Sequence, residues 1–77
     1  MKTKYAATFS NGQTITRTSD RTYRAAWLFH YTGFSGAPAQ RSGFARDVAT
    51  ARRTMANEGR LWGGGKPLLF SEVVELA

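Results

Sequence analysis

The chain has 77 residues, no cysteine and one histidine, and its eleven lysines and arginines outnumber five acids, which gives a formal charge of +6. A chain of this length forms one small domain with a thin core, and without thiols it has no disulfide framework and no zinc or iron–sulfur scaffold. No apolar run approaches the roughly 20 residues that span a bilayer, and residues 1–4 do not open a signal peptide, so we expect a cytoplasmic protein without membrane contact.

The positive charge is concentrated in residues 1–66, which hold all eleven cations and three acids, whereas residues 67–77 hold only two acids. Eight of the cations are arginines. The planar guanidinium suits phosphate and carboxylate oxygens, which favours an anionic polymer or an acidic protein surface as partner. A GC-rich genome produces the same richness in alanine, arginine and glycine. Composition alone therefore leaves open whether the arginines serve an anionic partner or merely follow the base composition of the gene.

Residues 4–18 predict a β-hairpin, because polar and apolar residues alternate on both sides of a turn at Gly12. A two-residue loop would put Ile15 on the polar face. A three-residue loop with Gly12 in the left-handed region pairs Ala7 with Ile15 and collects the apolar side chains on one face. We expect this second register, which also places Arg17 on the apolar face near the end of the sheet.

Residues 23–32 are ambiguous, because Ser19 can cap a helix there while aromatic and β-branched residues alternate as they do in a strand. The alternation and the glycine that follows favour a third strand. Residues 33–41 contain two glycines and a proline, and they predict a surface loop.

The next segment has the spacing of a helix, with Ser42 as the N-cap and Gly59 as the C-terminal stop. Its apolar residues recur in one narrow stripe. That stripe consists of Phe44, Val48, Ala51 and Met55. We expect Arg46 and Arg53 on the opposite, solvent-exposed face.

Residues 61–67 contain three consecutive glycines and predict a flexible connector, and residues 68–76 alternate as a final strand. The expected order is β-β-β-α-β within a single domain of residues 1–77, an α+β fold in which one helix packs on one face of an antiparallel or mixed sheet. The other face would then be open to solvent, to a partner or to a homodimer.

Motifs for catalysis and for cofactors are incomplete. The glycines before Lys66 suggest a phosphate loop, but Arg60 stands where that loop needs its first glycine, and Pro67 stands where it needs a hydroxyl. Residues 33–36 lack one position of a nucleophile elbow, and His30 has no companion as a base or a metal ligand. The five acids have plainer structural roles than paired glycosidase carboxylates. We therefore expect no enzyme activity, no cofactor and no metal.

Binding through surface charge is the remaining hypothesis, since basic and aromatic residues interleave as phosphate neutralisation and base stacking require. A domain this small needs Tyr23 and Trp27 in its core. Trp62, beside the glycine run, is a better exposed anchor. The residues expected to contact a partner are Arg46, Arg53, Arg60, Trp62, Arg17, Arg24 and Lys66.

Part of the chain resembles small proteins encoded by phages and other mobile elements. The stretches that carry this likeness are Thr16-Arg17-Thr18-Ser19, Arg21-Thr22-Tyr23, Ala25-Ala26 and Gly43-Phe44-Ala45. In size, single-domain build and charge, rather than in a residue motif, the chain is also similar to the anti-CRISPR proteins, which bind a CRISPR surveillance complex and block target recognition. The resemblance implies an inhibitor without chemistry whose arginines meet acidic patches or nucleic acid. The alternative is a small basic regulator that binds DNA or RNA directly.

Overall fold

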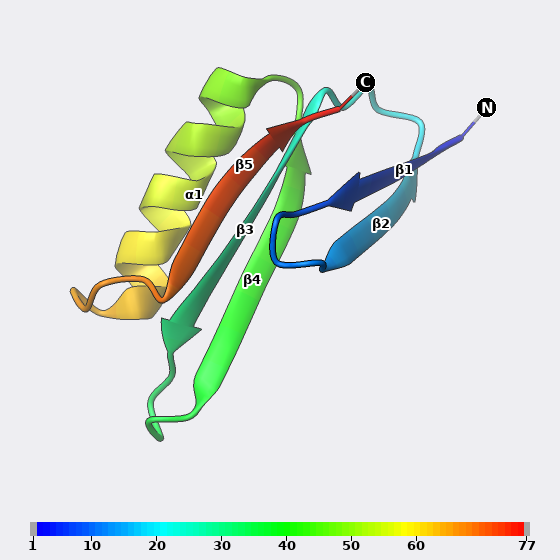
Figure 1. Cartoon of the computed structure of the whole chain (residues 1–77). Coiled ribbons are helices and arrows are strands. Elements are labelled where there is room, and N and C mark those ends of the chain that lie inside the picture. Colours follow the sequence, from blue (N-terminus) through cyan, green and yellow to red (C-terminus); the bar gives the residue numbers. More distant parts are fainter. Residues whose placement is uncertain (1, 77) are drawn as a thin grey trace.

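The computed structural model describes residues 2–76, which form five strands and one helix (Figure 1). The elements are β1 (Thr3–Thr8), β2 (Thr14–Ser19), β3 (Ala25–Thr32), β4 (Pro38–Ala45), α1 (Val48–Gly63) and β5 (Phe70–Glu75). The α+β class with a single helix is confirmed, but the chain has one strand more than expected. No helix within residues 2–76 is long and apolar enough to cross a membrane.

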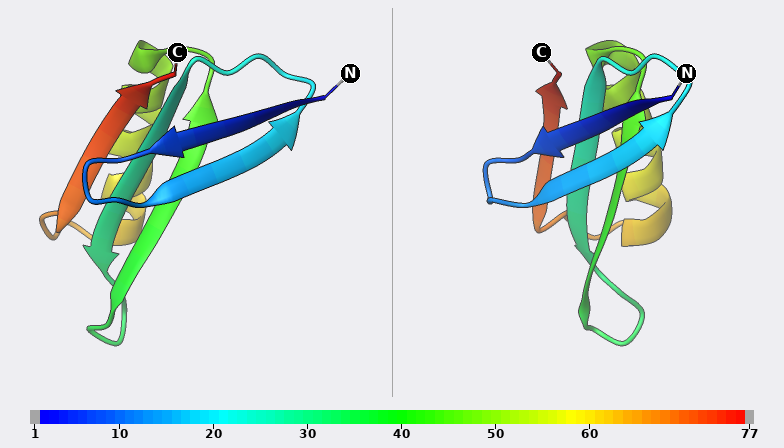
Figure 2. Two further views of the ribbon diagram at one scale, coloured as in Figure 1. Left: turned by 45° about the vertical axis from the view of Figure 1, so that its right-hand side comes forward. Right: turned by 90° about the vertical axis from the view of Figure 1, so that its right-hand side faces the viewer.

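The molecule has three layers, with a central antiparallel sheet of order β4-β3-β5 between α1 on one face and the β1–β2 hairpin on the other (Figures 1 and 2). On the helix side, Phe29 of β3 packs with Ala51 of α1. On the hairpin side, Leu28 of β3 packs with Phe9. The expectation of an open sheet face is therefore wrong. The hairpin covers that face, so nothing there supports the expected homodimer.

The hairpin has the register expected from its sequence, with Ala7 opposite Ile15 and Gly12 in the left-handed region at φ 89°. Its apolar face is the one that covers β3. A hydrogen bond from the backbone N of Ser10 to Glu72 Oε1, 2.7 Å long, ties the turn to β5. Glu72 interrupts the alternation of β5 for this reason.

The third strand is confirmed, but the loop expected over residues 33–41 is shorter, because β4 already begins at Pro38. Only residues 33–37 connect the two strands, and the backbone N of Gly33 closes this loop on the carbonyl of Ala37 at 2.8 Å. A proline at the first position of an edge strand removes no sheet hydrogen bond, so Pro38 is compatible with β4 even though it resembles a loop signal.

The helix was expected too early in the chain. Ser42 lies within β4 rather than at an N-cap, and Phe44 packs on the hairpin side of the sheet. The N-cap is Asp47, whose carboxylate accepts a hydrogen bond from the backbone N of Thr50 at 2.7 Å. Phe44 precedes Val48 by four residues, so a strand residue continued the helical spacing by coincidence.

The helix also ends later than expected, at Gly63, with Gly64 in the left-handed region at φ 60°. Gly59 is not a stop: it is buried inside α1, where a Cβ would lie 3.1 Å from a methyl group of Leu68. Leu61 and Trp62 therefore belong to the last turn of the helix rather than to a flexible connector. This difference fixes the position of the Trp62 side chain.

Asp47→Ala is expected to lower the thermal midpoint at neutral pH. The backbone hydrogen bond from Thr50 and a second from its hydroxyl hold the pKa of Asp47 below its ordinary value, with a smaller contribution from Arg46. A carboxylate with a lowered folded-state pKa stabilises the fold fully above its unfolded pKa, about 3.9, and loses that contribution as the pH falls through the folded pKa.

The measurement is a pair of melting curves, one at neutral pH and one below that folded pKa. The difference between Asp47→Ala and the parent chain should shrink in acid. Asp20→Ala, which removes an exposed carboxylate from the turn after β2, is the control. A difference between Asp47→Ala and the parent that stays the same at both pH values would contradict the capping role.

Candidate binding surfaces

The seven residues expected to contact a partner do not form one surface. Arg17 and Arg24 lie near the start of β3, whereas Trp62 and Lys66 lie near its end, about 20 Å away along a strand of this length. Arg53 and Arg60 are exposed on α1, and Arg46 precedes the helix instead of lying on it. The predicted residues therefore lie in two separate regions, one at each end of β3, and on α1 between them.

The region near the start of β3 is cationic, but its aromatic rings pack against one another. The rings of Tyr5 and Tyr23 meet edge to face with their centroids 5.2 Å apart, and the centroids of Tyr23 and Phe44 are 5.7 Å apart. The Arg17 guanidinium lies 5.7 Å from the centroid of Tyr23. Tyr23 is half-buried in this cluster, so its ring does not offer a free face for stacking.

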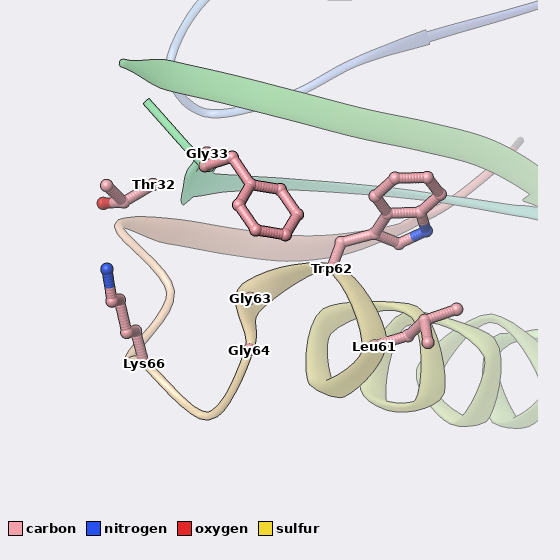
Figure 3. Close-up of a pocket in the computed structure, with 8 residues that line it drawn as sticks. Thr32, Gly33, Leu61, Trp62, Gly63, Gly64 and Lys66 are labelled. Atoms are coloured by element: carbon pink, nitrogen blue, oxygen red, sulfur yellow. The ribbon is translucent and has the colours of Figure 1, made fainter. Parts of the chain in front are cut away.

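The opposite end carries a cluster of apolar side chains, here called the Trp62 patch and consisting of Phe34, Leu61 and Trp62, which are exposed, and Tyr31, which is half-buried. Phe34 is 114% exposed, Leu61 70% and Trp62 45%. Together with Gly33, the patch lines an open cleft of about 360 Å³. A neighbouring cleft continues past Thr32 to Lys66, as Figure 3 shows.

Two turns bring the Trp62 patch together. In the connection from β3 to β4, the backbone N of Gly36 donates to the carbonyl of Gly33 at 2.9 Å, and Phe34 projects from the resulting β-turn. At the end of α1, the backbone N of Lys66 donates to the carbonyl of Gly63 at 3.0 Å. This bond places Lys66 beside the cleft.

Trp62 is held in place from two sides. The Arg41 guanidinium lies 4.3 Å from the centroid of the Trp62 ring and 3.6 Å from Glu58 Oε1. On another side, the ring centroid of Tyr31 lies 6.4 Å from that of the same indole. Arg41 Nε is buried without a hydrogen-bond partner within residues 2–76, although 39% of the Arg41 side chain is exposed. The indole therefore packs on Arg41 and Tyr31 while 45% of Trp62 remains exposed.

The sequence predicts Trp62 as an exposed anchor, but it does not predict Phe34 and Leu61 beside it or the contact of Arg41 with its ring. The signal for Phe34 was available, since a large aromatic residue in a glycine-rich turn has no core to enter. The position of Arg41 over Trp62 depends on β4, whose first half the sequence predicts as a loop and whose second half it predicts as the start of the helix.

The solvent side of α1 forms a second candidate surface, here called the outer face of α1. Residues spaced by three, four and seven positions make it up, and they are Ala49, Thr50, Arg53, Ala56, Asn57 and Arg60. Arg60 Nη2 donates to Asn57 Oδ1 at 2.7 Å. Within residues 2–76, neither Arg53 nor Arg60 makes a salt bridge.

Within the same residues, no three His, Cys, Asp or Glu side chains gather as metal ligands would. The single histidine, His30, forms a hydrogen bond with Gln13 and packs on Phe70 at 5.3 Å. Comparison with protein families, with curated proteins and with solved structures found no match for this chain.

Proposed function

We propose that this chain is a non-enzymatic binding protein that inhibits a host nucleoprotein defence complex of the CRISPR type, and that the Trp62 patch docks on a protein of that complex. The observation that carries the docking role is the exposure of two large apolar side chains, Phe34 and Leu61, beside an exposed tryptophan that Arg41 contacts. The likeness in size and charge to anti-CRISPR proteins supports the choice of target.

Exposed apolar area of this kind favours association. Burial stabilises a complex by about 25 cal/mol per Å², and tryptophan, tyrosine and arginine are enriched among the residues that dominate binding energy. Arg41 already fixes the Trp62 ring, so docking immobilises fewer side chains than it would for a mobile anchor.

The cleft also indicates the chemistry of the partner. Its walls are apolar at Phe34, Leu61 and Trp62, while Lys66 lies at one end. The nearby carboxylate of Glu58 is engaged by Arg41. A protein surface that inserts one apolar side chain and presents an acid toward Lys66 matches this arrangement.

The test is the double variant Phe34→Ser/Leu61→Ser, compared with the parent chain in cells that carry an active CRISPR system and are transformed with a targeted plasmid. The parent should restore transformation, and the double variant should lose this protection. The affinity of the double variant for the purified CRISPR complex should be at least about tenfold weaker than that of the parent chain. Leu69→Ser, at a side chain 62% exposed but outside both clefts, should retain inhibition. Full inhibition by the double variant would rule out the patch.

A further inference from the structure

We propose that the outer face of α1 is a second binding site, which enters the major groove of duplex DNA. The site is separate from the Trp62 patch and does not depend on it. Three features support the assignment: the chemistry of the side chains, the accessibility of the helix on its side of the sheet, and the uncompensated charge.

The side chains of the outer face suit base edges. Ala49 and Ala56 are exposed and small, so the helix backbone can approach the groove floor. Arg53, between the two alanines, offers a guanidinium, which pairs with guanine, and Asn57, which follows Ala56, offers an amide, which pairs with adenine. Asn57 is already oriented by its hydrogen bond with Arg60.

The body of the protein does not obstruct the helix. The three strands behind α1 span about 10 Å from the first to the last backbone. The helix with its side chains is about 10–12 Å across, and the major groove, about 12 Å wide, accommodates it. Figures 1 and 2 show α1 alone on its side of the sheet, with the hairpin on the other side.

The charge on this side of the molecule is complementary to DNA. Glu58 is the single acid within α1, and it pairs with Arg41 at 3.6 Å. Arg52 and Arg53 are exposed in the middle of the helix, and no salt bridge within residues 2–76 involves either of them. At the start of the helix, Asp47 is partly balanced by Arg46 at 3.7 Å.

The same structure argues against RNA as the ligand. The major groove of an A-form duplex is too narrow for a helix, and single-stranded RNA needs exposed rings on which bases can stack. The outer face of α1 contains no aromatic residue, so it offers no stacking platform for single-stranded RNA. Only a B-form duplex accommodates the outer face of α1.

The spacing of the arginines predicts what the helix would read. Arg53 and Arg60 are seven residues apart, which corresponds to about 10.5 Å along the helix axis. A helix lying along the groove therefore places the two guanidiniums about three base-pair steps apart. Selection from a randomised duplex pool should enrich guanines at that separation.

The decisive experiment measures fluorescence anisotropy of a labelled mixed-sequence DNA duplex with two matched variants. Ala56→Glu adds a carboxylate at the centre of the outer face, and Ala6→Glu adds the same charge on the exposed face of the hairpin. We expect Ala56→Glu to weaken binding at least about tenfold, and Ala6→Glu to change it less than about twofold. Circular dichroism verifies that both variants fold. Equal losses would show delocalised charge attraction and overturn the assignment.

Charge removal provides an independent measurement. Arg53→Gln and Arg60→Gln should each weaken duplex binding more than Arg17→Gln, and they should abolish the guanine enrichment. Tighter binding of single-stranded or duplex RNA than of duplex DNA would overturn the proposal. Phe34→Ser/Leu61→Ser should leave DNA affinity unchanged, so failure of the proposed inhibitor function and failure of the DNA site are distinguishable.

Discussion

Phe29→Ala is expected to leave the chain largely unfolded at room temperature. Phe29 has no exposed surface, and its ring lies between Trp27 at 5.8 Å and Tyr31 at 5.7 Å. Truncating a buried phenylalanine costs about 3–5 kcal/mol, because apolar contact is lost and a cavity remains. The single core of a chain this short rarely supplies more than about 3–5 kcal/mol of stability, so the loss is as large as the whole stability.

The effect should be specific to burial. Phe34→Ala makes the same chemical change at a side chain that is 114% exposed, and its free energy of unfolding should remain within about 0.5 kcal/mol of the parent. Urea unfolding followed by circular dichroism measures both variants. If Phe29→Ala unfolds at the parent's urea concentration, the three-layer arrangement around β3 is incorrect.

The hairpin shows how much of this fold local sequence determines. Its register follows from two constraints that lie within residues 4–18: apolar residues must share one face, and Gly12 can adopt positive φ. What the hairpin packs against is not encoded locally. In β3, Ala26 and Leu28 are buried under the hairpin, but His30 and Thr32 follow them on the same face and make that face resemble a solvent-exposed one, so the alternation alone does not reveal the second layer.

The boundary between β4 and α1 shows the opposite limit. Ser42 and Asp47 are both good N-cap residues, and Phe44 fits the helical stripe as well as it fits a strand. The choice between a strand and a helix at Phe44 depends on long-range contacts. Phe44 packs against Tyr5 of the hairpin and against Tyr23 of the segment that follows the hairpin. Sequence reasoning therefore placed the helix too early and missed β4.

The candidate surfaces followed the same division. Trp62 was identified from its neighbours in sequence, since tryptophan beside three glycines is an exposed anchor. Its contact with Arg41 and its proximity to Phe34 depend on β4 and on the turn before it, which bring residues more than twenty positions apart together. The outer face of α1 was only partly identified, because Arg46 lies before the helix.

Gly43→Ala is expected to destabilise the fold by about 1–3 kcal/mol, the usual cost of overpacking a core. Gly43 lies opposite Trp27 in the sheet, and a Cβ on Gly43 would sit 2.7 Å from the indole. The indole has little room to withdraw, since it is 5% exposed and stacks on Phe29 with an interplanar angle of 14°. A glycine inside a strand is thus required by close packing rather than by a turn.

The matched control is Gly63→Ala, at the last residue of α1. A Cβ there would meet Leu68 at 3.6 Å, an ordinary contact, and the backbone φ of Gly63 is not positive. Because alanine loses less conformational entropy in a helix, this variant should be as stable as the parent or up to about 1 kcal/mol more stable. Urea unfolding distinguishes the two signs. Equal stability of Gly43→Ala and Gly63→Ala would mean that Trp27 moves freely, and then the indole would not hold β4 against the helix side of the sheet.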